Sequence, residues 1–188
     1  DAGCGPGASA TLIASEFDCE VIGVTLEESA AAEAKERAAK REVAGSVEVL
    51  VGDVMTADLA NEGFDAAIAE CVVSIFPDKP AGLQTITQTL KPGGRLGITD
   101  VTVDGALPSP LRGVLAVAGC VGDAMPLDAY AELIQRSGLE VEATDALPGV
   151  AADFVKGIRN KLMFAEIGAK LGKIPLSAES INEAKAML

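Results

Sequence analysis

The chain has 188 residues, 49% of them hydrophobic, which is enough apolar material to bury the core of one domain. Its formal net charge of −13 argues against a nucleic-acid partner, because proteins that bind nucleic acids present a basic face. The absence of histidine excludes a Ser-His-Asp triad and most zinc sites. We find no stretch long enough to span a membrane and no signal peptide, so we expect no membrane partner.

The most informative stretch comes first and places three glycines in the run Asp1-Ala2-Gly3-Cys4-Gly5-Pro6-Gly7. Glycine lets the backbone turn sharply and lets a ligand approach the main chain. A helix over 8–16 would point its free N–H groups at that turn. The pattern indicates a nucleotide-binding turn after a strand of a doubly wound fold. Asp1 would mark the end of that strand, which the sequence itself lacks, and its carboxylate favours a ligand bearing an ammonium or other cation.

The following elements alternate between strands and helices. We predict strands over 20–24, 46–51, 64–69, 95–101 and 139–144, and helices over 82–90, 111–121, 130–137, 150–171 and 178–188. Thr25-Leu26-Glu27-Glu28 has the form of a capping box, which predicts Thr25 as the N-cap of a helix that runs to about Val43. The run Lys91-Pro92-Gly93-Gly94 predicts a turn.

This order predicts the α/β class, with a doubly wound, mostly parallel sheet whose first strand is missing. We expect residues 1–145 to form a ligand-binding domain and residues 146–188 to form a helical extension packed on it. In such sheets ligands bind outside the carboxyl ends of the strands. Residues at those ends are therefore the candidates for function.

The four cysteines are scattered and form no C-x-x-C pair, which predicts reduced thiols and a cytoplasmic setting. Cys4 and Cys19 are expected to serve packing. Cys71 ends one predicted strand and Cys120 follows another, so both thiols should face the crevice at the carboxyl ends.

Three stretches together resemble class I S-adenosylmethionine-dependent methyltransferases. They are D-A-G-C-G-P-G, Gly52-Asp53 and L-K-P-G-G-R-L at 90–96. The resemblance implies a Rossmann-like methyltransferase fold and S-adenosylmethionine as cofactor. It also implies that the turn containing Asp1, Gly3, Gly5 and Gly7 holds the methionine moiety and that Asp53 accepts from the adenine amino group.

The end of the second strand departs from this family. The family usually has an acidic residue there that binds the ribose hydroxyls, whereas this chain has Thr25. Some members of the family that this chain resembles, such as the cyclopropane synthases, also carry G-V-T-L at that point. Thr25 is therefore a candidate both for ribose contact and for helix capping, and Glu27 or Glu28 could replace it at the ribose.

Within the family, the chain looks most like the arsenite methyltransferases, from Asp1 to about Val141. The similar stretches are E-C-V-V-S-I-F-P-D-K at 70–79, residues 90–103 and G-C-V-G-D-A at 119–124. The resemblance implies that Cys71 and Cys120 bind trivalent arsenic as substrate. Ala10 replaces a further family cysteine, and Glu70, a candidate for cofactor contact, replaces an asparagine. Trivalent arsenic is soft and favours three sulfur ligands, so two thiols leave one place for glutathione or another small thiol.

The leading hypothesis is methyl transfer to a small metalloid substrate, trivalent arsenic. Its lone pair needs no general base, which agrees with the absence of histidine. One alternative is a small organic, quinone-like acceptor with Glu70, Asp100 or Asp104 as base. Another is a cofactor-binding module without catalysis, and a dehydrogenase is a weaker enzyme alternative.

Overall fold

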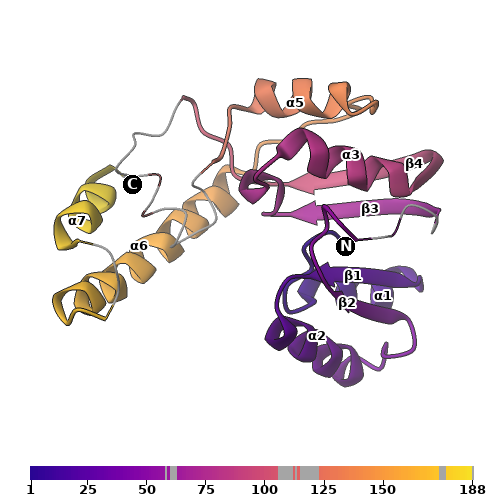
Figure 1. Ribbon diagram of the computed structural model, residues 1–188, viewed down its shortest axis with the longest axis horizontal. Coiled ribbons are helices and arrows are strands. Elements are labelled where there is room, and N and C mark those ends of the chain that lie inside the picture. The colour runs from indigo at the N-terminus through magenta and orange to yellow at the C-terminus, as the bar shows by residue number, and fades with distance from the viewer. Residues whose placement is uncertain are drawn as a thin grey trace. The chain divides into compact units, whose positions relative to one another are not determined.

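The computed structural model describes residues 1–57, 59, 63–105, 112, 114, 123–173 and 177–187. The chain divides into two compact units, Asp1–Asp100 and Val101–Leu188. The first unit contains α1 (Ala8–Phe17), β1 (Val21–Thr25), α2 (Glu28–Lys40), β2 (Val47–Val51), β3 (Phe64–Glu70), the 3-10 helix η1 (Val73–Ile75), α3 (Lys79–Thr89) and β4 (Leu90–Thr99) (Figure 1). The second contains α5 (Leu127–Arg136), α6 (Pro148–Lys170) and α7 (Ala178–Met187). Most of the helix predicted over 111–121 lies outside the described residues.

The strands of the first unit are parallel, which confirms the predicted α/β fold. β1 pairs with β2 and β3 pairs with β4. Ala2 joins the two pairs through parallel bridges to Val24 of β1 and Ala69 of β3. The resulting order is β2, β1, the short Asp1–Ala2 segment, β3 and β4. The first two residues of the chain therefore lie where the central strand of a five-stranded sheet would end.

β4 begins earlier than the sequence predicts. Phe64 pairs with Leu90, but Ala66 pairs with Arg95, so residues 91–94 interrupt the ladder. The predicted turn is this irregularity inside the strand, where Gly93 takes a φ of 81°.

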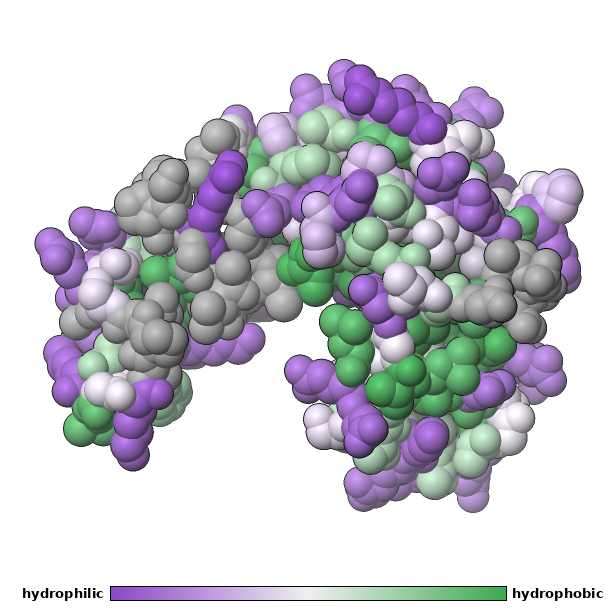
Figure 2. Space-filling model, viewed as in Figure 1, coloured by the Kyte–Doolittle hydropathy of each residue, from purple (hydrophilic) through white to green (hydrophobic). Residues whose placement is uncertain are grey.

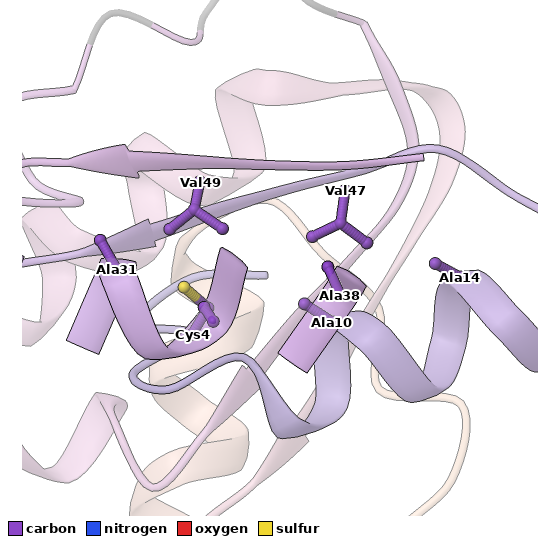
Figure 3. Close-up of a cluster of buried hydrophobic side chains, with 8 residues drawn as sticks. Cys4, Ala10, Ala14, Ala31, Ala38, Val47 and Val49 are labelled. Atoms are coloured by element: carbon purple, nitrogen blue, oxygen red, sulfur yellow. The ribbon is translucent and has the colours of Figure 1, made fainter. Parts of the chain in front are cut away.

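Small side chains form the core between the helices and the first strand pair. α1 and α2 contact each other, β1 and β2. Figure 3 shows the cluster they build: Cys4, Ala10, Ala14, Ala31, Ala34, Ala38, Val47 and Val49. Because alanine carries only a methyl group, the two helices approach the sheet and each other closely.

The predicted capping box is wrong. α2 begins at Glu28 with Glu27 as N-cap, and no side chain caps it. Thr25 instead ends β1 and is buried, so its backbone continues the sheet rather than turning into the helix. α3 does have a side-chain cap, because Asp78 accepts from the Ala81 N–H at 3.0 Å.

In the second unit, α6 and α7 pack through a buried cluster of Val114, Ile158, Leu162, Ile181 and Ala184. Glu166 of α6 accepts from Lys170 at 2.6 Å and also from Lys185 of α7.

The strand predicted over 139–144 is wrong, because these residues form neither strand nor helix. The segment alternates apolar and polar residues, but most of its side chains are exposed. Among the residues that the structure describes, no helix is both long and apolar enough to cross a membrane.

Candidate functional site

The sequence-predicted site residues of the first unit gather at one edge of its sheet. The glycine turn follows Ala2 between β1 and β3, Thr25 ends β1, Asp53 follows β2, and Glu70 and Cys71 follow one another at the end of β3. Parallel strands end at the same edge, so this is the carboxyl edge at which such sheets bind ligands. Cys120 lies outside the described residues.

The glycine turn is shaped by packing on two sides and is open on the third. Gly3, Gly5 and Gly7 all have positive φ, at 75°, 49° and 72°. A Cβ on Gly3 would lie 2.6 Å from Val72 Cγ2, and one on Gly7 would lie 2.6 Å from Ala34 Cβ. A Cβ on Gly5 would meet nothing within 4 Å. The backbone at Gly5 is therefore the part of the turn that a ligand can approach.

Asp1 offers a carboxylate oxygen beside the turn. Its backbone belongs to the sheet, because the Asp1 nitrogen donates to the Ile22 carbonyl at 2.8 Å and its carbonyl accepts from Val24 at 3.0 Å. The Oδ2 atom is buried and has no hydrogen-bond partner within the described structure. A buried carboxylate oxygen without a donor is unfavourable, so this atom is suited to a ligand ammonium.

Other residues that the sequence reasoning missed brace the turn. The Thr11 hydroxyl donates to the Gly7 carbonyl at 2.8 Å. Arg37 of α2 donates through Nε to the Pro6 carbonyl at 3.0 Å. The Ser9 hydroxyl donates to Glu70, which links the first turn of α1 to the end of β3. For Ser9, the signal in the sequence is a hydroxyl residue two positions after Gly7, in the first helical turn.

Asp53 follows β2 and its side chain is exposed. Its Oδ1 accepts from the Met55 N–H at 2.9 Å, and its carbonyl accepts from Thr56 and Ala57. These bonds hold Asp53 at the start of a turn. A carboxylate has a second oxygen, which can accept from an amino group.

The described cysteines divide by environment. Cys4 is buried in the alanine cluster, where Gly23 leaves room for its sulfur, since a Cβ there would lie 2.7 Å from Sγ. Burial raises the pKa of the Cys4 thiol, so it stays protonated and packs, as expected. Cys19 is half-buried at the other end of β1, away from the carboxyl edge.

Cys71 is exposed at the carboxyl edge and has a φ of 52°. Its N–H donates to the Thr99 carbonyl of β4 at 2.8 Å, so the left-handed residue is anchored to the sheet. Within the described ranges, no three Cys, Asp or Glu side chains gather to hold a metal ion.

Of the three carboxylates considered as general bases, two accept a hydrogen bond and the third belongs to the second unit. Asp100, just after β4, accepts the Ser74 N–H at 2.8 Å, and Glu70 accepts from Ser9. Asp104 is exposed and belongs to the second unit.

Comparison with known proteins identifies the group to which this site belongs. A family profile described as "Methyltransferase domain" matches residues 1–138. The chain belongs to this methyltransferase family. The predicted family and its cofactor, S-adenosylmethionine, are confirmed. The residues at the carboxyl edge of the sheet should therefore be able to bind this cofactor.

The relatives of this methyltransferase have different acceptors in their names. It is 31% identical over 143 residues to an arsenite methyltransferase of Halobacterium salinarum, covering 74% of the chain and 36% of that protein. It is 30% identical over 189 residues to the O-methyltransferase resE of Aspergillus sclerotiorum, covering 97% of the chain and 70% of that protein. The chain thus spans about a third of the first relative and more than two thirds of the second.

Solved structures agree on the fold. The [4+2]-cyclase SpnF matches with a TM-score of 0.78 at 22% identity, over 100% of this chain and 66% of that one. CrArsM, an arsenic(III) S-adenosylmethionine methyltransferase from Chlamydomonas reinhardtii, matches with a TM-score of 0.63 at 26% identity, over 83% of this chain and 58% of that one.

The residues present fit S-adenosylmethionine. Asp1 Oδ2 lacks a partner and can accept from the ammonium of the methionine moiety. The open backbone at Gly5 leaves room for the same moiety. Asp53 can accept from the adenine amino group, and Thr25 lies between the two at the end of β1.

Proposed function

We propose that this methyltransferase moves a methyl group from S-adenosylmethionine to a small acceptor, and that the acceptor is trivalent arsenic bound by Cys71 and Cys120. The observation that supports trivalent arsenic as the acceptor is the exposed thiol of Cys71 at the carboxyl edge, on a backbone anchored in the left-handed conformation. Strained backbone that its surroundings hold in place is concentrated at functional sites.

The protein's share of the chemistry is to hold and orient. S-adenosylmethionine, when bound, supplies an electrophilic methyl group on its sulfonium. The glycine turn and Asp1 fix the methionine end, and Asp53 fixes the adenine end. Cys71 and Cys120 hold the arsenic so that its lone pair faces the methyl group. Such alignment can lower a barrier by about 7–11 kcal/mol in favourable cases.

The absence of histidine from the chain supports an acceptor that needs no base. Glu70 and Asp100 each accept a hydrogen bond on one carboxylate oxygen, from Ser9 and from Ser74. An arsenic lone pair requires no proton transfer, whereas a hydroxyl acceptor has a proton to lose. A third sulfur from glutathione or another small thiol would complete the arsenic ligands.

A second candidate is O-methylation of a small organic acceptor. The observation that favours it is the match to fungal O-methyltransferases over 97% of the chain, which is more than the arsenite methyltransferase covers. Glu70 would then be the nearest candidate base, released from Ser9 when substrate binds.

One set of variants distinguishes the two acceptors. Methyl transfer from S-adenosylmethionine to arsenite is measured in the presence of glutathione for Cys71→Ser, Cys120→Ser and Cys19→Ser. We expect both of the first two variants to lose arsenite methylation and Cys19→Ser to retain it, because Cys19 lies away from the carboxyl edge. Unchanged turnover in Cys71→Ser would reject the arsenic proposal. Turnover of a phenolic acceptor that survives both substitutions but not Glu70→Gln would establish the second candidate.

A further inference from the structure

Arg37 is a charged side chain of α2 that reaches the glycine turn. Its Nε donates to the Pro6 carbonyl at 3.0 Å, across thirty-one positions of the chain, while its Nη2 pairs with Glu33 at 3.1 Å. Figure 2 shows hydrophilic residues over the outer side of α2. On this helix 39% of the Arg37 side chain is exposed, against 73% for Lys40 three residues further along. Arg37 therefore lies at the border between the solvated face of α2 and the turn.

Arg37 and Ala34 contact the same part of the turn. They are three residues apart in α2, so their side chains are neighbours on the helix surface. Ala34 is buried, and a Cβ added to Gly7 would lie 2.6 Å from the Cβ of Ala34. Arg37 binds the carbonyl of Pro6, the residue before Gly7. The first contact limits how closely the turn approaches α2, and the second limits how its peptide plane is oriented.

The turn needs such a restraint because glycines supply much of its backbone. Gly5 and Gly7 both have positive φ, and glycine loses more conformational freedom on folding than any other residue. The Gly7 N–H closes the turn by donating to the Cys4 carbonyl at 2.9 Å. A Cβ added to Gly5 would meet nothing within 4 Å, which leaves that side open to a ligand. Fixing the Pro6 carbonyl orders the backbone between the two glycines from the side of α2.

We propose that Arg37 is a positioning residue for S-adenosylmethionine, which acts through Pro6 to hold the glycine turn in the conformation that binds the cofactor. This rests on the proposed function only for the place of the cofactor and not for the acceptor. The apparent dissociation constant of a ligand rises as the fraction of protein in the binding conformation falls. Loss of the Arg37 contact therefore weakens cofactor binding even though Asp1, Gly5 and Asp53 are unchanged.

Calorimetric titration of the full chain with S-adenosylhomocysteine tests the proposal. Arg37→Met removes the guanidinium and keeps a long side chain of similar helix propensity. We expect its dissociation constant to rise about tenfold over that of the wild type. Lys40→Met is the matched control, because it removes the same charge and the same kind of ion pair, with Glu36 at 2.7 Å, from the same helix. Its affinity should stay within about twofold of the wild type.

Amide hydrogen exchange without cofactor reports on the turn itself. The Gly7 amide, which closes the turn, should exchange about tenfold faster in Arg37→Met and at the wild-type rate in Lys40→Met. The Val24 amide, which donates to the Asp1 carbonyl at 3.0 Å within the sheet, is the internal reference and should not change. Arg37→Lys keeps a charged donor without the planar fork, so it should recover part of both the Gly7 protection and the affinity.

Unchanged affinity in Arg37→Met would overturn the proposal, whether or not the Gly7 amide exchanges faster. Weaker binding with unchanged Gly7 exchange would also overturn it, because the effect would not pass through the turn. Equal losses in Arg37→Met and Lys40→Met would assign the effect to the charge of α2 instead. A wild-type chain that binds no S-adenosylhomocysteine would reject the cofactor site on which the proposal rests, which is a separate result. None of these readouts depends on methyl transfer.

Discussion

Three non-glycine residues of the described chain have positive φ, and only one of them lies at the site. Asp18 and Glu42 follow the ends of α1 and α2, where left-handed residues commonly end helices. Cys71 instead follows a strand, with a φ of 52°. Its conformation thus has no helix-capping role and serves to direct the chain at the carboxyl edge.

Replacing Cys71 with glycine should separate stability from activity. A side chain in the left-handed region destabilises the folded state by about 1–2 kcal/mol. Glycine removes this cost, but its more flexible unfolded state lowers the free energy of unfolding by about 0.5–1 kcal/mol. We expect Cys71→Gly to raise the free energy of unfolding by about 0.5–1 kcal/mol in a urea titration while arsenite methylation is lost. Asp18→Gly is the control, with a smaller stability gain and unchanged activity. A destabilised Cys71→Gly would contradict the assignment of strain.

The glycines of the turn should respond differently to the same methyl group. Gly3→Ala places Cβ against Val72, so we expect destabilisation of several kcal/mol or failure to fold. Gly5→Ala meets no neighbour and should cost only about 1 kcal/mol for its positive φ. Its added methyl group projects into the space proposed for the methionine moiety. Calorimetric titration should therefore show weaker binding of S-adenosylhomocysteine by Gly5→Ala, and unchanged affinity would place the cofactor elsewhere.

Among the elements, α6 and α7 are joined by a carboxylate held between two lysines. Hydrogen bonds from Lys170 and from Lys185 lower the pKa of Glu166 to about 2, from an ordinary value of 4.5. A carboxyl whose pKa is depressed in the folded state stabilises it above the unfolded pKa. This contribution is lost as the pH falls from 4.5 towards 2.

Glu166→Gln should reveal this pH dependence. We expect the variant to be less stable than the wild type at pH 7, and the difference in urea midpoint to shrink towards zero near pH 2. Glu132→Gln is the control, because the ion pair that the structure describes for Glu132 lies within its own helix, with Arg136 at 3.5 Å and both side chains exposed. A difference between wild type and Glu166→Gln that stays constant with pH would mean that the lysines do not act on Glu166.

Several elements could be predicted from the sequence because short-range patterns dominate them. The alanine-rich segment after Gly7 and the apolar runs at Val21 and Val47 form α1, β1 and β2 close to the predicted limits. Long-range contacts determine the elements that the sequence did not predict. Thr25 fits a local capping pattern but ends β1 instead, and the alternating residues 139–144 form no strand. Neither outcome is visible in local sequence.

The candidate site was predictable to a similar extent. Its residues at strand ends, such as Asp53 and Cys71, follow from the rule that parallel strands end at one edge. The contacts that brace it do not, because Arg37 reaches Pro6 across thirty-one positions and Ser9 reaches Glu70 across sixty-one. The unpartnered oxygen of Asp1 also depends on packing rather than on residue type.

The whole molecule carries 28 acidic and 15 basic side chains. A net charge of −13 destabilises the compact state through self-repulsion, which salt screens. Calorimetry should show Tm rising by a few degrees between about 10 mM and 500 mM NaCl at pH 7. Sucrose at matched osmolality controls for solvent exclusion. A Tm that falls with salt would mean that ion pairs outweigh repulsion.

The alanine cluster beneath the glycine turn has an entropic consequence. Alanine has no side-chain rotamers to lose on folding, whereas long side chains lose up to about 2 kcal/mol each. The contacts of Ala10, Ala31 and Ala34 therefore form without freezing any side-chain torsion. The alanine surface that contacts Gly7 has a single arrangement of its atoms, so this one contact of the turn does not depend on a side-chain rotamer.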